Sequence, residues 1–370
     1  MIHEQSETTC MELDARKQRI LQAVVEDYVA TAEPVGSHVL VQRYSLGVKS
    51  ATIRNEMAEM SERGYLRQPH TSAGRVPSDL GYRFYVNRLM ALPVIQEGEA
   101  ERIQHAVATA SLELDAILRR TCQLLAAMTH LPAVATPPAA NDTELRQIFV
   151  SPAGADRTLV VLLFSTGHTE SRIVELPLSA SDALTLVNAL NSQFVGMTLT
   201  ALLGIIAENE RVPGELWQLS VHWRRLIAEI VQAARNAVAD ESAMYVEGTH
   251  AALRHPEFRD VDRLTQFLAM LQERAALLEM LGRAVSVPPG VSIVARPRAA
   301  SVMVTIGEET GRPEMADYAI VSTAYYVGDR ESGTIGVLGP TRMDYGRAAA
   351  AVDLMARTVS DLLTRLSVAP

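Results

Sequence analysis

One segment of the chain, residues 34–90, constrains the fold more than any other. Its apolar and turn residues predict a helix, a turn, a second helix and a short β-hairpin with a polar, glycine-containing loop. This order is typical of a winged helix, a fold that commonly lies against duplex DNA. The segment holds 8 basic and 4 acidic residues, whereas the whole chain has a net charge of −9. Nucleic-acid phosphates would therefore be attracted to this part of the chain only.

Capping residues and helix breakers set the boundaries in this region. They predict, in order, a helix from Asp14 to Pro34, a helix that Ser37 caps and that runs to Tyr44, a helix that Ser50 caps and that ends at Gly64, hairpin strands at Tyr65–Gln68 and Val76, and a helix that Ser78 caps. The third helix should bury one face and expose the other. Its predicted buried residues are Ile53, Met57 and Met60, and its predicted polar face holds Thr52, Asn55, Glu56 and Glu59.

The third helix carries the residue types that read bases. In a helix-turn-helix, the second helix enters the major groove with its N-terminal residues against base edges. Ala51 and Thr52 suit a thymine methyl group, and Asn55 can form two hydrogen bonds with adenine. Ser50 and the first N–H groups of the helix suit a phosphate, as does Arg54. Glu56 either accepts a hydrogen bond from a cytosine amine or points away.

The hairpin loop supplies a second set of candidate contacts. Its small residues can donate hydrogen bonds to phosphates, and its arginine can enter a narrow minor groove. The predicted contacts are His70, Thr71, Ser72, Gly74 and Arg75. An ordinary β-turn would also explain Ser-Ala-Gly, so the combination of loop and helix is what favours DNA binding. Further candidate backbone contacts are Lys49, Arg43 and Arg67.

The remaining chain predicts a mixed fold of helices and strands. Strands are expected at 145–150, 159–164, 171–176, 291–295, 302–306, 319–326 and 334–338. A helix-dominated section, 180–285, separates the first three strands from the last four. We interpret this order as one α+β sheet domain that a mainly helical insertion interrupts, with two helices that are distant in the chain covering the sheet. The segment LPAVATPPAAND, residues 131–142, is predicted to be a loop.

Apolar residues recur along one stripe from Ile103 to Met128, alternating at spacings of three and four. Two interpretations remain open: a coiled coil between two copies of the chain, or a helix that packs on its own sheet. Ala110 and Thr121 weaken the stripe as a coiled-coil seam, so the second interpretation is favoured.

The absence of several well-known motifs argues against some classes of protein. No zinc-protease, serine-hydrolase or nucleotide-binding motif occurs, so we expect neither an enzyme nor a cofactor. His250, His255 and Glu257 fit a loop better than a metal site, and Gly333–Tyr345 fits a strand-to-helix turn. Cys10 and Cys122 form no CxxC motif, and no apolar run is long enough to cross a membrane. We therefore expect a cytoplasmic protein without a membrane partner.

Several blocks resemble a known family. They are EDYVATAEPVGS, SATIRNEM, GYLRQPHTSAGRVPSDLGYRFYV, YVEG, PEF and IGVLGPTRMDY, in this order along the chain. From about residue 13 to 365, the chain resembles the HrcA family, the heat-inducible transcription repressors of bacteria. The resemblance places residues 50–55 in the family's recognition helix and residues 70–75 in its wing.

The resemblance also implies an architecture and partners. The expected parts are a disordered N-terminus at 1–12, a winged-helix DNA-binding domain at 13–92, a GAF-like domain at 93–195 and 288–370, and an inserted dimerising domain at 196–287. The implied function is that of a homodimeric repressor on double-stranded DNA. Its operator is an inverted repeat, the CIRCE element, upstream of chaperone operons, and the chaperonin GroEL promotes its active state. An inverted repeat requires two-fold symmetry in the protein that binds it.

Two other functions remain open from the sequence. In a metabolite-responsive winged-helix regulator, the GAF-like domain would act as the sensor, and its pocket would hold converging polar groups. In an enzyme with an accessory DNA-binding head, activity would survive the removal of residues 1–90.

Overall fold

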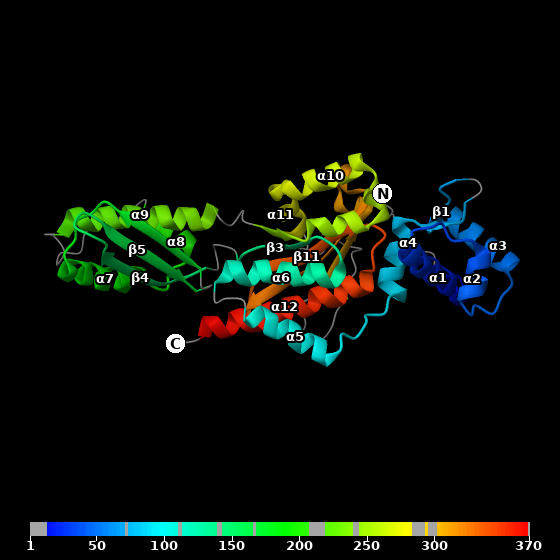
Figure 1. The fold of residues 1–370 in the computed structure, drawn as a ribbon, viewed down its shortest axis with the longest axis horizontal. Helices are drawn as coiled ribbons and strands as arrows, with labels where there is room; N and C mark the ends of the chain where they lie inside the picture. The colour runs from blue at the N-terminus through cyan, green and yellow to red at the C-terminus, as the bar shows by residue number, and fades with distance from the viewer. Residues whose placement is uncertain are drawn as a thin grey trace, which may run out of the picture. The chain divides into compact units, whose positions relative to one another are not determined.

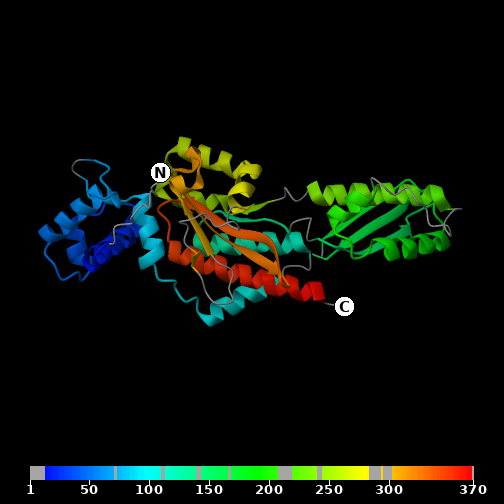
Figure 2. The same ribbon diagram turned by 180° about the vertical axis from the view of Figure 1, so that it is seen from behind.

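The computed structural model describes residues 13–70, 73–109, 113–138, 143–165, 168–206, 219–239, 244–282, 293–294 and 302–368. The fold is α+β, with helices and strands along the whole chain (Figures 1 and 2). The chain divides into two compact units. The first, here called the head, comprises residues 1–93, 304–319 and 339–347; the second, the body, comprises residues 94–303, 320–338 and 348–370. The predicted disorder of residues 1–12 lies outside the described residues.

The head begins with three helices and a hairpin, in the predicted order. Its elements are α1 (Ala15–Thr31), α2 (Ser37–Arg43), α3 (Ser50–Glu62), β1 (Leu66–Arg67), β2 (Val76–Pro77), α4 (Asp79–Phe84), the π-helical turn η1 (Tyr85–Leu89) and the 3-10 turns η7 (Gly307–Thr310) and η8 (Pro313–Met315). Strands β1 and β2 are antiparallel, with Leu66 opposite Pro77. The helix and strand predictions for this region are therefore confirmed, although each strand is only two residues long.

Local chemistry explains why α1 begins and ends where it does. The Asp14 carboxylate accepts hydrogen bonds from the backbone N–H groups of Arg16 and Lys17, and so caps the helix. At the other end Ala32 adopts a left-handed conformation with φ 59°, two residues before Pro34. The apolar stripe between these ends is buried, as its helical period predicts.

Helix α4 is bound to a segment more than 200 residues away in the sequence. Ser78 caps α4 as predicted, by accepting a hydrogen bond from the Gly81 N–H. The Nε of Arg83 donates to Glu309 Oε1 at 2.6 Å, and its Nη2 donates to the other carboxylate oxygen and to the Val304 carbonyl. Glu309 also accepts from the Ile306 N–H at 2.8 Å. Both charged groups are thus hydrogen-bonded, which is the condition for burying them.

A second contact holds the start of α4 against the same turn. Asp79 Oδ2 accepts a hydrogen bond from the Glu308 N–H at 3.2 Å, and burial raises the pKa of the Asp79 carboxyl group. Gly307 lies so close that a Cβ atom there would be 2.0 Å from Asp79 Oδ2, and its φ of 51° also favours glycine. An acidic and a basic residue of α4 therefore bind one turn, η7.

The GPTRMDY segment performs a related structural role. Arg342 donates a hydrogen bond to the Val29 carbonyl of α1. Asp344 accepts from the Arg347 N–H at 2.9 Å and caps the following helix, and the Tyr345 ring lies 5.6 Å from the Tyr82 ring. The predicted strand-to-helix turn is confirmed, and its side chains also hold α1 and α4.

A six-stranded sheet, in the order β7-β3-β11-β10-β9-β8, belongs mainly to the body, while residues 304–306 of β9, 318–319 of β10 and 339–340 of β11 are counted with the head. Its strands are β3 (Ala133–Ala135), β7 (Tyr245–Glu247), β8 (Ile293–Val294), β9 (Val302–Ile306), β10 (Tyr318–Val327) and β11 (Arg330–Pro340). Helices α6 (Leu114–Thr129) and α12 (Tyr345–Val368) cover one face of this sheet, as the two opposite views agree (Figures 1 and 2). This confirms the prediction that two helices distant in the chain cover the sheet.

The remaining helices of this part of the body are α5 (Glu97–Ala108), α10 (Val261–Gln272), α11 (Arg274–Gly282) and the 3-10 turns η5 (Thr249–Arg254) and η6 (Pro256–Arg259). The stripe from Ile103 to Met128 is divided between α5 and α6; Ile103, Val107, Leu114, Ile117 and Thr121 are buried within this chain, and Leu124 and Met128 are half-buried. The structure thus agrees with the interpretation of a helix that packs on its own sheet. Ala110 lies outside the described residues.

Strand β3 corrects one prediction. Residues 133–135 lie in the segment that was expected to be a loop, yet they pair on both sides, with β11 and with β7. All three are buried. A three-residue strand between Pro132 and Pro137 is too short to show the period of two that identifies a strand in a sequence.

A separate module lies between β3 and β7 in the chain. Strands β4 (Leu145–Pro152), β5 (Thr158–Phe164) and β6 (Thr169–Val174) form their own antiparallel sheet, at the predicted positions. Helices α7 (Ala180–Phe194), α8 (Leu199–Ile206) and α9 (Ser220–Ala239) follow. One apolar core joins these six elements, from Leu145 to Ala234. We call residues 143–239 the inserted module.

The module differs from the insertion expected at 196–287. The first three strands do not belong to the main sheet, so the insertion begins before residue 145 and ends before β7. Helices α10 and α11, which were expected inside the insertion, follow β7 instead. The physical reason is the shared core: α7 and α9 pack on the three-stranded sheet, which separates these strands from β3 and β11.

No helix within the described ranges has both the length and the apolar composition that crossing a bilayer requires.

Replacement of Glu309 with Gln should loosen α4. The change leaves the Arg83 guanidinium, which is 10% exposed, with a neutral partner, and we expect a cost of about 1–3 kcal/mol. Hydrogen exchange of peptides that cover residues 79–90 should therefore accelerate by roughly tenfold or more. Glu314→Gln is the matched control, because Glu314 is mostly exposed and its ion pair with Arg312 measures 3.5 Å. Equal exchange in both variants would contradict the role assigned to Glu309.

Candidate nucleic-acid interface

Helix α3 presents one exposed stripe and one buried face. Ile53, Met57 and Met60 are buried, which confirms the predicted core face. On the opposite side Ala51 and Asn55 are exposed, and Thr52 is half-buried. In the part of the chain that the structure describes, no side-chain partner is found for Asn55. These residues can therefore meet a ligand without breaking an internal contact.

The N-terminus of α3 differs from the prediction in its capping residue. Lys49, not Ser50, occupies the N-cap position, and its side chain makes no capping hydrogen bond. Ser50 is the first helical residue, and its hydroxyl lies 2.9 Å from the hydroxyl of Ser37 on α2. Ser37 likewise begins α2, whose N-cap is Gly36. Without a side-chain cap, the first amides of α3 are available to an anion such as a phosphate.

Glu56 does not share the exposed stripe of α3, contrary to the prediction that placed it beside Asn55, whereas Glu59 lies one turn after Asn55 and is 43% exposed, as predicted. The Glu56 side chain is only 14% exposed and pairs with Lys17 of α1 at 2.8 Å and with Arg16 at 3.5 Å. Glu59 pairs with Lys17 at 3.2 Å and with Arg63 at 3.0 Å. A helix turns about 100° per residue, which puts Glu56 on the flank of α3 that faces α1 rather than on the outward stripe.

Sequence reasoning missed Lys17. One signal could have found it: Lys17 stands three, four and seven positions before Ile20, Leu21 and Val24, on the buried stripe of α1. A charged residue on such a stripe needs a partner of opposite charge, which only the fold can identify.

The hairpin loop is hydrogen-bonded to the segment that precedes α2. Val35 and Arg75 exchange two backbone hydrogen bonds, each 2.9 Å long. Gly74 is required for this approach, because a Cβ atom at that position would lie 2.4 Å from the Val35 carbonyl oxygen. Gly74, which was predicted as a DNA contact, therefore has a packing role.

The Arg75 side chain is directed toward α3. Its Nε donates a hydrogen bond to the Ser61 hydroxyl at 2.9 Å, and Ser61 donates to the Met57 carbonyl at 2.9 Å. This contact, which the sequence did not reveal, fixes the loop beside the exposed stripe of α3. His70 is exposed at the other end of the loop, while the predicted contacts Thr71 and Ser72 lie outside the described residues.

The basic candidates fall into two groups. Lys49 and Arg54 are exposed at the N-terminal end of α3, and Arg67 is exposed on β1. Arg43 instead pairs with the buried carboxylate of Asp27 at 2.7 Å. Arg43 is therefore less suited to a phosphate than Lys49 and Arg54.

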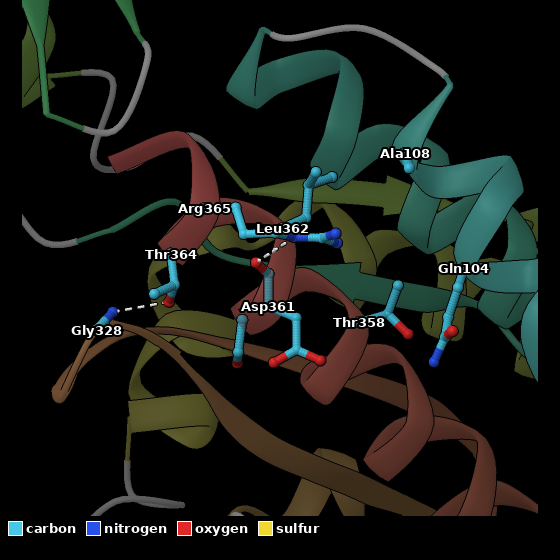
Figure 3. A pocket seen from close by; sticks show the side chains of 9 residues that line it. Gln104, Ala108, Gly328, Thr358, Asp361, Leu362, Thr364 and Arg365 are labelled. Atoms are coloured by element: carbon cyan, nitrogen blue, oxygen red, sulfur yellow. Dashed lines mark hydrogen bonds between the residues drawn. The ribbon is translucent and has the colours of Figure 1, made fainter. Parts of the chain in front are cut away.

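The body contains a pocket of about 600 Å³ between α5, α12 and the turn at Gly328 (Figure 3). Its hydroxyl groups already make hydrogen bonds: Ser360 accepts from the Tyr326 N–H, and Thr364 accepts from the Gly328 N–H. The charged residues of its lining are Asp361 and Arg365. Since the hydroxyls serve the fold, this pocket does not favour the metabolite-responsive alternative.

Comparison with known proteins identifies the family. Residues 115–349 match the family model "HrcA protein C terminal domain". The chain is 38% identical over 357 residues to the heat-inducible transcription repressor HrcA of Symbiobacterium thermophilum, which covers 95% of this chain and 98% of that relative. The HrcA of Desulforamulus reducens is 35% identical over 361 residues, with 96% and 99% covered.

The chain belongs to the HrcA family of transcription repressors. A solved structure, described as the crystal structure of a hypothetical protein at 2.2 Å resolution, shares the fold of this member. It matches with a TM-score of 0.59 at 21% identity, over 96% of this chain and 98% of that one.

Replacement of Gly74 with Ala should detach the loop from Val35. The added methyl group cannot fit 2.4 Å from a carbonyl oxygen, so we expect the free energy of unfolding to fall by about 1–3 kcal/mol. We also expect weaker DNA binding. Thermal unfolding and hydrogen exchange of residues 75–78 are the measurements. Gly98→Ala in α5 is the control, since a Cβ atom there meets open space. An unchanged hairpin in Gly74→Ala would show that the close approach is not needed.

Proposed function

We propose that this protein represses transcription as a two-fold dimer bound to an inverted-repeat operator, the CIRCE element upstream of chaperone operons. In this proposal the chaperonin GroEL promotes the repressing state, and heat shock ends the repression. Membership in a family whose curated members are named heat-inducible transcription repressors supports the repressor function. The geometry of the head supports DNA as the ligand.

One observation carries this proposal: α3 and the hairpin loop are held together as one rigid pair. The Arg75–Ser61 hydrogen bond and the bridge to Val35 keep the loop beside the exposed stripe of α3. We interpret this arrangement as a winged helix, in which α3 enters the major groove while the loop follows the neighbouring backbone. An isolated polar helix would not need such a brace.

Each exposed residue of α3 has a role in this proposal. Asn55 reads adenine, and Ala51 with Thr52 contacts a thymine methyl group. Lys49, Arg54 and the first amides of the helix bind phosphates. Ser50 helps by placing the start of α3 against α2 through Ser37.

The loop is proposed to contact the backbone beside the helix. His70, Thr71 and Ser72 are its candidate phosphate contacts. To enter a minor groove, the Arg75 guanidinium would first have to break its hydrogen bond with Ser61 and then contact the DNA instead.

The inserted module is the part that we propose for dimerisation. Its helices pack on one face of the three-stranded sheet, and the other face also carries apolar side chains, among Gln147, Ser151, Thr169 and Ser171. Leu159, Val161 and Leu163 of β5 point to that outer face, with Phe149 opposite Val161 and Ile173 opposite Leu159. Phe149 is 49% exposed and Ile173 is 66% exposed. An antiparallel sheet with one face in water normally alternates apolar and polar residues, so this face fits a second copy of the chain.

The sheet domain of the body takes the GAF-like role in this proposal, and the family resemblance supports the chaperonin as partner. Footprinting on the organism's own chaperone promoters, with and without purified chaperonin, tests the proposed function. We expect an inverted repeat to be protected, and we expect the protection to increase when chaperonin is added. Equal affinity for scrambled and palindromic duplexes would contradict the proposal.

Replacement of Asn55 with Ala should relax base preference rather than abolish binding. A two-bond contact to adenine provides about 1–3 kcal/mol of discrimination, while phosphate contacts supply nonspecific affinity. The ratio of affinities for operator and scrambled duplexes should therefore fall, with scrambled binding nearly unchanged. Gln123→Ala, an exposed amide on α6, is the control. A uniform loss on all sequences would mean that Asn55 does not read a base.

Charges on the outer sheet face should separate the dimer. Phe149→Glu with Ile173→Glu places two like charges in the proposed interface, where desolvation disfavours them. Sedimentation should show a folded monomer that binds an operator more weakly than the dimer does. Leu253→Glu is the control, because Leu253 is an exposed apolar residue outside the module. A double variant that stays dimeric would place the interface elsewhere.

A further inference from the structure

Three carboxylates surround one ammonium group in the head. Lys17 Nζ lies 2.8 Å from Glu56, 3.0 Å from Asp14 and 3.2 Å from Glu59, and its side chain is 10% exposed. A lysine ammonium has three N–H donors, so each carboxylate can receive one.

We propose that Lys17 is a positioning residue of the DNA interface: it holds Glu56 on the α1 side of α3, away from the DNA, and pairs with the more exposed Glu59, so that neither carboxylate acts on the DNA as an unpaired negative charge. This inference deepens the proposed function and rests on it. Lys17 itself contacts no phosphate, since its three donors are engaged inside the head.

The charges of α3 show why such a residue is needed. From residue 49 to 63 the chain carries three basic residues, Lys49, Arg54 and Arg63, and three acidic ones, Glu56, Glu59 and Glu62. This segment alone offers a polyanion no net attraction. With Glu56 and Glu59 paired by Lys17, the N-terminal part of the exposed stripe, beside Lys49 and Arg54, keeps a positive charge, while the exposed Glu62 lies two turns further along α3. Loss of Lys17 leaves Glu56 with Arg16 alone, which is 57% exposed and 3.5 Å away.

The choice of lysine is itself informative. Lys17 and Lys49 are the only lysines among the 34 basic residues of the chain, and all others are arginine. An ammonium is a compact point charge that three separate carboxylates can approach, whereas a guanidinium is a planar fork that suits one or two. Arginine at position 17 is therefore not equivalent, although it keeps the charge.

The environment of Lys17 keeps it charged. The hydrogen bond to Glu56, followed by that to Asp14, raises the pKa of the Lys17 ammonium above its ordinary value. An amine reacts with acylating reagents only when it is deprotonated, so Lys17 should be protected while Lys49 reacts.

Amine labelling of the full-length protein tests the burial directly. The two lysines are the only side-chain amines, and mass spectrometry follows each peptide after treatment with an acetylating reagent. In the free protein Lys49 should react faster than Lys17 by roughly tenfold or more, because reaction requires the neutral amine. Equal rates at the two sites would overturn the inference. On operator DNA, Lys49 should become protected; if it does not, the proposed function fails while the result for Lys17 stands.

A mutant cycle tests the positioning role. Lys17→Met should weaken operator binding by roughly tenfold at low salt, and the loss should shrink as salt screens the released carboxylates. Glu56→Gln with Glu59→Gln should change binding by less than about twofold in the presence of Lys17, but should restore it in the Lys17→Met background. Additive effects would overturn the inference, because a direct phosphate contact by Lys17 predicts no restoration and a lower salt slope.

Two further variants separate positioning from folding. Arg16→Met removes the same charge one residue away and should leave affinity within about twofold of the original protein. Lys17→Arg keeps the charge and should still lose part of the affinity; full activity in this variant would overturn the geometric argument. If circular dichroism shows that Lys17→Met does not fold, Lys17→Arg replaces it in the cycle, with the same two outcomes.

Discussion

The ion pair between Arg83 and Glu309 is the interaction on which the head depends. Its two residues are separated by 226 positions in the sequence, and both are largely withdrawn from water. Burial of such a pair is tolerated when further hydrogen bonds satisfy its donors and acceptors, and here the Val304 carbonyl, the Asn87 side chain and the Ile306 amide supply them. Because α4 follows β2 after a single residue, fixing α4 also fixes the end of the hairpin. The hairpin in turn braces α3 through Arg75. The head therefore combines residues 1–93 with residues 304–319 and 339–347, so the segment expected at 13–92 is only one part of this compact unit.

Local signals in the sequence predicted most elements correctly. Asp14 and Ser78 cap their helices as expected, the buried face of α3 is the predicted one, and strands β4, β5 and β6 lie where alternation placed them. These successes share a cause: caps, breakers and periodicity act within a few residues, so a single segment contains the information. The exposed positions of Ala51, Asn55 and Arg54 were predicted for the same reason, since helical geometry alone determines them.

The misses all involve partners that are distant in the sequence. Ser50 was expected to cap α3, but its hydroxyl lies against the hydroxyl of Ser37. The sequence left the direction of the Glu56 side chain open, and the ion pair with Lys17 determines it. Arg75 was expected at the tip of a wing, yet Ser61 holds it against α3. The sequence did not predict strand β3, because its three residues form a strand only through their backbone pairing with β7 and β11. The extent of the insertion was misplaced for a related reason, as shared packing and not composition decides which sheet a strand joins.

The pairing of β3 with β7 has a consequence for how the body is assembled. These strands are antiparallel neighbours, with Ala135 opposite Tyr245, so the chain leaves the six-stranded sheet and returns to it at adjacent points. In topological terms the inserted module occupies a hairpin loop. Its removal and replacement by a tight turn would leave strand order and direction unchanged. The inserted module and the head are thus encoded in separate stretches of the gene, and the module can diverge in sequence without changing the order of the strands in the six-stranded sheet.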